Sequence, residues 1–135
     1  MTAIDTNVLV RYLVRDDAKQ AEAARALLEG LTRQDPGFVC REVAIELVWV
    51  LERAYRFGRA EIADVLLELL ATDCLVFESA DYVISSVLRY RQGGPGFSDL
   101  MILAAAQRAE ALPLHTFDGR LAGVDGTALV HTSRS

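Results

Sequence analysis

Acidic residues at the ends of apolar runs are the side chains of this sequence best placed to do chemistry. Asp5 and Asp118 each follow a short apolar run that is typical of a strand, and Asp99 directly precedes an apolar helical segment. Carboxylates that converge on one place repel each other unless they bind cations or protons. These positions therefore predict a metal site, and a metal site of this kind predicts hydrolysis of phosphodiester bonds.

The metal expected at such a site is Mg²⁺ or Mn²⁺, as one ion or two. Neither His115 nor His131 has a cysteine or histidine at ligand spacing, and Cys40 and Cys74 match no metal or redox spacing. Hard carboxylate oxygens without sulfur or imidazole select these divalent cations.

Each acid also has an ordinary structural interpretation. Asp5 and Asp99 could cap the helices that follow them, because Asp is favoured at helix starts and in turns. Asp118 could end a strand in an Asp-Gly turn. Glu46, a fourth candidate, falls at the edge of the polar side of a predicted helix, where a solvated surface acid is the usual explanation. On local grounds these interpretations stay open.

The elements that must position these acids alternate along the chain. Predicted strands cover residues 2–4, 38–40, 75–77, 112–117 and 128–131, and predicted helices cover residues 7–15, 17–30, 41–56, 59–72, 80–91 and 99–111. Short apolar strands between helices are typical of an α/β protein whose parallel sheet is covered on both faces. We therefore expect a three-layer α/β/α sandwich with a central parallel sheet. Ligands of such sheets bind outside the carboxyl ends of the strands, where Asp5 and Asp118 would meet.

Composition limits the domain organisation and the location of the protein. The chain has 135 residues, which predicts one domain over residues 1–135. It shows no apolar stretch of the ~18 residues needed to span a bilayer and no basic region typical of a signal peptide. We therefore expect a cytoplasmic protein that does not enter a membrane.

The charge of the chain bears on nucleic-acid binding. A net charge of −5 argues against indiscriminate binding to nucleic acid. Arg11 and Arg15 lie one helical turn apart just after Asp5, so they are candidate phosphate contacts. Their alternative role is pairing with Asp16 and Asp17.

Other functions remain to be weighed against a metal-dependent nuclease. A phosphatase with Asp5 as nucleophile would need a second acid two residues later, and Asn7 stands there. A phosphoryl receiver would need a lysine near the last strand, but Lys19 is the only lysine. A non-catalytic RNA- or protein-binding module is a third alternative, although all four candidate acids are present.

Four segments together resemble the PIN domain family. Asp5-Thr6-Asn7-Val8-Leu9 is similar to its opening, Glu46-Leu47-Val48-Trp49-Val50-Leu51 to its second-acid helix, Phe97-Ser98-Asp99-Leu100-Met101-Ile102 to its third-acid segment, and Thr116-Phe117-Asp118 to its closing motif. The order and spacing agree over nearly the whole chain. The short single-domain length most resembles the VapC toxins of bacterial toxin–antitoxin pairs.

The resemblance carries its own implications. It implies a PIN-like α/β/α fold and metal-dependent endoribonuclease cleavage of RNA, with Asp5, Glu46, Asp99 and Asp118 as the catalytic and metal-binding acids. Asn7 and Thr116 match positions that support such a cluster. It further implies a homodimer and a cognate antitoxin that covers the active site.

Overall fold

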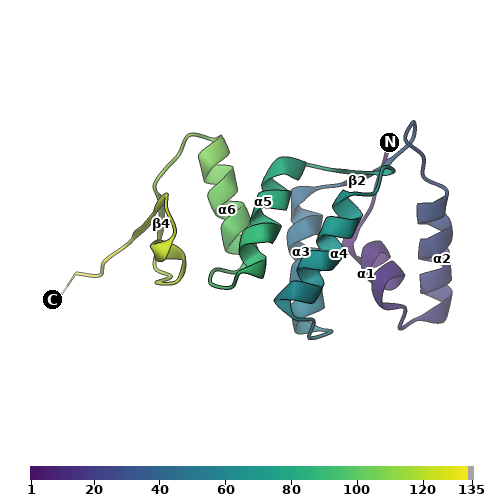
Figure 1. Cartoon of the computed structure of the whole chain (residues 1–135), viewed down its shortest axis with the longest axis horizontal. Helices are drawn as coiled ribbons and strands as arrows, with labels where there is room; N and C mark the ends of the chain where they lie inside the picture. The colour runs from purple at the N-terminus through teal and green to yellow at the C-terminus, as the bar shows by residue number, and fades with distance from the viewer. Residues whose placement is uncertain (134–135) are drawn as a thin grey trace.

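The computed structural model describes residues 1–133 as an elongated α/β molecule (Figure 1). Its helices are α1 (Thr6–Val14), α2 (Ala18–Glu29), α3 (Arg41–Arg53), α4 (Arg59–Leu70), α5 (Ala80–Arg91), α6 (Phe97–Arg108) and the 3₁₀ turn η1 (Leu121–Gly123). Its strands are β1 (Thr2–Ala3), β2 (Gly37–Val39), β3 (Leu75–Phe77), β4 (Leu114–Thr116) and β5 (Thr127–Leu129). The expected alternation of strands and helices is confirmed.

The first three strands form a parallel sheet in the order β1-β2-β3, and helices flank it. Strand β2 is central and begins at Gly37, where a Cβ atom would lie 2.8 Å from Leu31 Cδ1 and 2.9 Å from Ile4 Cγ1. A side chain at this position would force the side chains of Leu31 and Ile4 to shift, so their close packing on the start of β2 favours glycine. The α/β class with a parallel sheet is thus confirmed.

Strands β4 and β5 form a separate parallel pair, which we call the C-terminal ribbon (residues 112–131). Figure 1 shows this ribbon beyond α6, at the end of the molecule opposite the N-terminus. The expectation that the strand ends before Asp5 and Asp118 share one sheet edge is therefore not met within a single chain. Both pairings are non-local, and a pattern of strands and helices does not specify which non-local edges join.

Capping explains where several helices begin and end. Asp17 Oδ1 accepts a hydrogen bond from the Gln20 N–H at 3.0 Å and starts α2, as predicted. Helix α3 ends at Arg53 with Ala54 as its C-cap, and it does not reach residue 56, where Arg56 has a positive φ of 57°. Gly58 does not mark that stop; it caps the start of α4, where its N–H donates to Glu61 Oε1 at 3.1 Å.

The boundaries of the C-terminal elements also differ from expectation. Helix α6 begins at Phe97, two residues earlier than predicted, with Gly96 as its extended N-cap. Strand β4 is shorter than residues 112–117, and β5 ends at Leu129, so His131 lies outside it. Within residues 1–133, no helix is long and apolar enough to cross a membrane.

One buried cluster holds the sheet and the helices together. It runs from Ile4 to Met101 and includes fully buried side chains of α1, α3 and α4 such as Leu9, Leu51 and Leu66. Among the described residues, none beyond Met101 belongs to this cluster. The main core therefore joins the three-stranded sheet to α1–α5, includes only the first turns of α6, and contains no residue of the ribbon.

Candidate functional site

Asp5 and Glu46 line one hollow of about 250 Å³, together with Asn7, Arg11 and Tyr55. Asp5 lies where β1 ends and α1 begins, and Glu46 lies on α3, which packs against α1. Both side chains are exposed. The structure thus brings two of the four predicted acids, and the predicted supporting residue Asn7, to the same place.

Asp5 takes its position from the cap that it provides. Its backbone is extended, and Oδ1 accepts a hydrogen bond from the Thr6 N–H at 2.7 Å. The capping interpretation is therefore confirmed, and it leaves the second carboxylate oxygen available at the positive end of the helix dipole. Next to it, Thr6 Oγ1 is buried and has no hydrogen-bond partner among the described residues. A buried polar atom without a partner beside a carboxylate fits a site that takes up an ion or water.

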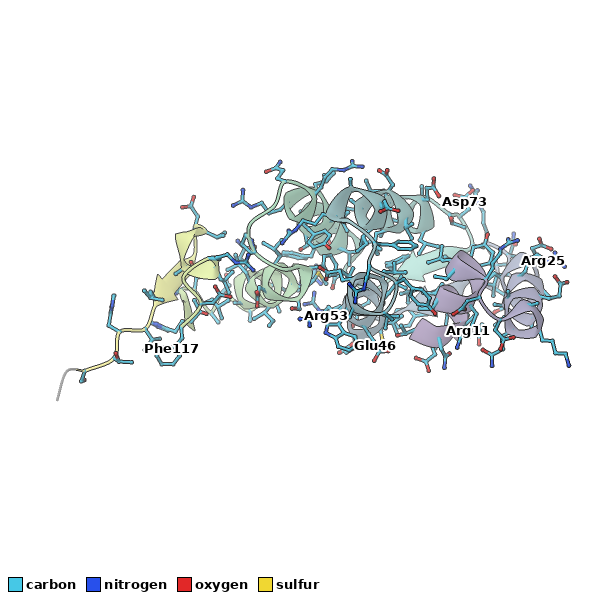
Figure 2. All side chains as sticks on the ribbon, turned by 90° about the horizontal axis from the view of Figure 1, so that it is seen from below. Arg11, Arg25, Glu46, Arg53, Asp73 and Phe117 are labelled. Carbon is cyan, nitrogen blue, oxygen red and sulfur yellow. The ribbon has the colours of Figure 1, made fainter. Side chains whose placement is uncertain are left out.

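Glu46 also lines a second, larger hollow. This hollow of about 560 Å³ is lined by Trp49 from the same helix, by Ser98 from the start of α6 and by Arg120 from the ribbon. Glu46 is therefore the acid that connects the β1 rim with the beginning of α6. Figure 2 shows Glu46 near Arg53 on α3, with Phe117 of the ribbon far from both.

Asp99 lies in the first turn of α6 and is half-buried. Its carboxylate turns back over the helix start, since a Cβ on Gly96 would lie 3.6 Å from Asp99 Oδ2. The positive end of the helix dipole stabilises a carboxylate in this position. The acid stands beside the second hollow, whose wall includes the neighbouring Ser98.

Arg59 fixes the loop that leads into Asp99, and sequence reasoning did not identify it. Its guanidinium donates to the carbonyls of Tyr90 at 2.8 Å, Pro95 at 3.1 Å and Gly94 at 2.9 Å. It also stacks over the Tyr90 ring at 4.5 Å from the centroid. Gly94 has a positive φ of 84°, which glycine adopts without strain. The only sequence signal for this contact was the run of glycines before α6.

Asp118 and Thr116 form a local turn at the end of β4. Thr116 Oγ1 accepts from the Asp118 N–H at 3.0 Å, and Asp118 Oδ1 accepts from the Arg120 N–H at 2.8 Å. The turn interpretation of Asp118 is therefore confirmed. Both residues belong to the ribbon, so this chain alone does not bring Asp118 to the rim of β1.

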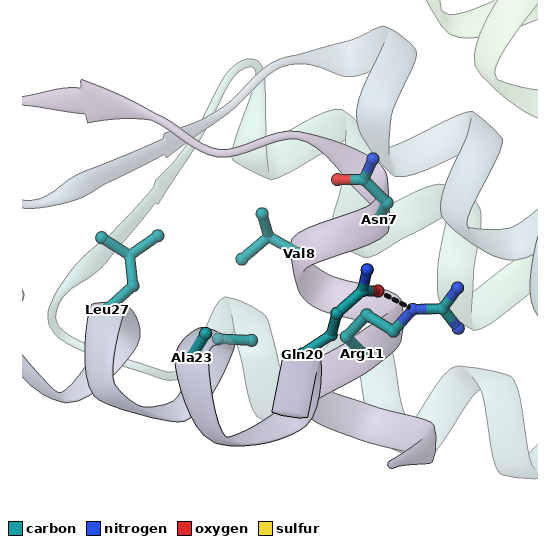
Figure 3. A pocket seen from close by; sticks show the side chains of 7 residues that line it. Asn7, Val8, Arg11, Gln20, Ala23 and Leu27 are labelled. Carbon is teal, nitrogen blue, oxygen red and sulfur yellow. Dashed lines mark hydrogen bonds between the residues drawn. The ribbon is translucent and has the colours of Figure 1, made fainter. Parts of the chain in front are cut away.

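Arg11 connects α1 with the start of α2 and with the residues that follow α3. Its guanidinium donates to Asp16 Oδ1 at 2.8 Å, to Gln20 Oε1 at 2.6 Å (Figure 3) and to the Tyr55 hydroxyl at 3.3 Å. The Tyr55 hydroxyl in turn donates to Asp16 Oδ2 at 2.8 Å and, with Arg11, lowers the pKa of that carboxyl. Tyr55 was not foreseen, and its contacts hold α1 against the end of α3.

These contacts bear on the two arginines predicted to bind phosphate. The salt bridge predicted as an alternative role is observed for Arg11, whose guanidinium already has an acidic partner. Arg15 is exposed at the C-cap of α1, and its Nε donates to the Tyr12 carbonyl at 3.4 Å. Among residues 1–133 it forms no salt bridge, so its charge remains available.

The donor chemistry fits a hard divalent cation, but the set of ligands in one chain is incomplete. Asp5 and Glu46 offer carboxylate oxygens at one hollow, and neither a cysteine nor a histidine lines it. Within the part of the chain that the structure describes, no three acidic, histidine or cysteine residues are close enough to hold a metal. The tight convergence of four acids that the sequence predicts is not seen inside one copy.

Comparisons with known proteins identify the family of this chain. A family model described as the PIN domain matches residues 2–127, which is most of the chain. A VapC ribonuclease of Aquifex aeolicus (strain VF5) is 28% identical over 109 residues, which cover 80% of this chain and 80% of that protein. The residues matched by the family model span all four predicted acids. This chain therefore belongs to the PIN domain family.

Proposed function

We propose that this protein is a metal-dependent endoribonuclease, a single nuclease domain over residues 1–135 that acts as the toxin of a toxin–antitoxin pair. The observation that carries the proposal is the common hollow of Asp5 and Glu46 at the start of α1, in a chain of the PIN family. The similarity to a VapC ribonuclease supports the finer assignment to RNA and to toxins.

In the proposed site, Asp5, Glu46, Asp99 and Asp118 would together hold one or two Mg²⁺ or Mn²⁺ ions once they are brought to one place. A bound ion of this kind activates water and stabilises the charge that develops on a phosphate oxygen. Asn7 lines the hollow beside Asp5, and Thr116 holds the backbone of Asp118, so both support the acids. No carboxylate attacks the substrate covalently in this scheme.

The proposed partners are an RNA substrate, a cognate antitoxin and a second copy of the chain. Arg15 is the better candidate for a phosphate contact, because its side chain is exposed and Arg11 already pairs with Asp16. The two arginines together would offset part of the negative charge that repels RNA. An antitoxin that inserts a basic side chain near Asp5 and Glu46 would block the hollow.

An RNA cleavage assay tests the proposal. We expect cleavage that requires Mg²⁺ or Mn²⁺ and stops in EDTA. Asp5→Ala and Asp99→Asn should each lose at least ~100-fold, since even outer contacts of metal ligands are worth about 10- to 100-fold. The matched control is Asp73→Asn, an exposed acid that pairs with Arg33 far from the hollow, and it should cleave like wild type. Cleavage that persists in EDTA would reject the metal-dependent reaction.

The incomplete set of acids in one copy favours a second candidate, an RNA- or protein-binding module on the same scaffold. Such a module would bind RNA equally well in EDTA and would cleave nothing. Expression in bacteria separates the two further. A nuclease toxin arrests growth, and Asp5→Ala relieves the arrest, whereas the effect of a binding module would not depend on that carboxylate.

A further inference from the structure

Strand β1 has one edge without a neighbour. The Thr2 N–H donates to the Pro36 carbonyl at 3.0 Å and the Ile4 N–H donates to the Phe38 carbonyl at 2.9 Å. Because alternate residues of a strand bond to opposite sides, the N–H and C=O of Ala3 point away from β2. Within the described residues, β1 is the end strand of its sheet, so this edge is open.

Strand β4 has an open edge of the same kind. The Leu114 N–H donates to the Gly126 carbonyl at 2.8 Å, and the Val130 N–H donates to the Thr116 carbonyl at 2.7 Å. By the same alternation, the N–H and C=O of His115 point away from β5. Within residues 1–133, β4 pairs with β5 alone. Strands β3 and β5 are also end strands of their sheets within the described residues, but only β1 and β4 lead directly into Asp5 and Asp118. Figure 1 shows the ribbon beyond α6, at the end of the molecule opposite the N-terminus.

The ribbon also exposes more apolar surface than a parallel pair tolerates alone. Purely parallel sheets are found covered on both faces, and a two-stranded sheet is marginal in water. Phe117 is 71% exposed, and Leu129 and Val130 are exposed beside it.

We propose that a second copy of this chain completes the sheet, with β4 of each copy paired in parallel with β1 of the other. The two sheets would then each have the order β3-β2-β1-β4-β5. Asp118 of one copy would come to the carboxyl end of β1 in the other copy, beside Asp5 and Glu46. The exchange of strands is independent of the proposed function, and only the catalytic role of the shared site rests on it.

The pairing would supply Asp118, one of the two acids absent from the hollow of Asp5 and Glu46, without a change in the fold of either copy. Strand alternation puts Ala3 opposite Leu114 or Thr116, and either register places Asp5 and Asp118 on the same face of the sheet. The site of the dimer would take Asp5 and Glu46 from one copy and Asp118 from its partner. A single copy would have no Asp118 at its own site, because its ribbon carries that residue to the site of the partner.

A cross-link tests the exchange independently of activity. With Cys40 and Cys74 replaced by serine, Ala3→Cys is combined with Leu114→Cys or with Thr116→Cys. Neighbouring strands lie about 4.8 Å apart, which suits a disulfide. We expect twice the chain mass by light scattering for the unmodified protein, and a covalent dimer on oxidation of one of the two pairs. Ala3→Cys alone, in the same background, should stay uncross-linked.

Mixing two inactive variants tests the shared site. Asp5→Ala and Asp118→Asn chains, unfolded and refolded together, should regain about a quarter of wild-type cleavage, because half of the two-fold dimers carry one intact site. The control mixture of Asp5→Ala and Glu46→Gln should regain none, since both residues come from the same copy. A monomeric mass, or a disulfide that closes within one chain, overturns the exchange. A covalent dimer without ribonuclease activity retains the exchange and rejects the proposed function.

Discussion

The region from β1 to α5 and the C-terminal ribbon are both built from parallel strands, yet they are stabilised differently. In the first region, side chains from the strands and helices bury one another in a continuous core. In the ribbon, Leu121 is buried outside that core, while Phe117 and Leu129 remain exposed. The two regions meet through α6, which packs on α5 and makes fewer contacts with α3.

This difference separates what holds the fold from what completes the site. Asp5 and Glu46 belong to the well-packed region, so their relative position is fixed by the core beneath them. Asp118 belongs to the weakly packed region, so its position depends on what the ribbon contacts. Changes in the first region should cost stability, and changes in the ribbon should chiefly cost assembly.

The largest expected effect is a core truncation. Leu51 is 0% exposed in α3, and Leu51→Ala should lower the free energy of unfolding by about 2–5 kcal/mol through lost burial and a cavity. Leu129→Ala on the ribbon should cost less than about 1 kcal/mol at chain concentrations where no dimer is detected. Urea unfolding followed by circular dichroism measures both. Equal costs for the two variants would remove the contrast between the regions.

A smaller effect is expected where the two regions join. Arg59→Ala removes three hydrogen bonds from a charged donor to the loop before α6 and should cost about 1.5–3 kcal/mol. Hydrogen exchange should increase over residues 93–99. Arg91→Ala, which breaks only an exposed pair with Asp64, should change stability by less than about 1 kcal/mol. If both variants behave alike, Arg59 does not position the start of α6.

The hydrogen bond from Tyr55 to Asp16 should make the stability of the well-packed region depend on pH. Tyr55→Phe removes the hydrogen bond that lowers the pKa of Asp16. A lowered carboxyl pKa contributes stability above the usual Asp range, and this stability is lost as the pH falls through that range. The variant should therefore lose less stability than wild type between pH 5 and about 3. Thermal unfolding at several pH values tests this, and parallel curves would contradict it.

The smallest effect should appear in alkali. Burial raises the pKa of Tyr90 to about 12, and the negative charge of Glu52 adds to the shift. The unfolded chain loses this proton near pH 10, so the contribution is complete below about pH 10 and lost toward pH 12. The Tyr90→Phe variant has no phenol to titrate, so it does not lose this stability in alkali. Its stability relative to wild type should be constant from pH 7 to 9 and rise at pH 11, as measured by urea unfolding.

Local signals in the sequence predicted the order of elements, and non-local contacts decided the rest. The capping residue Asp17 and the positions of the short strands were found as expected because each depends on a few adjacent residues. The four motifs with Asp5, Glu46, Asp99 and Asp118 indicated the family that the family model confirms. Arg59 and Tyr55 were missed because each acts on a segment more than 30 residues away, at a range no local pattern records.

The open edges of β1 and β4 also set how the protein responds to its own concentration. If each complete site draws on two copies, the number of active sites rises with the square of the chain concentration while copies are scarce. A low concentration of the chain would then form almost no complete sites, and a rise in synthesis would form many. If β4 of each copy paired with β1 of a different copy instead of exchanging with one partner, copies would add head to tail without closing, and the product would be a fibre.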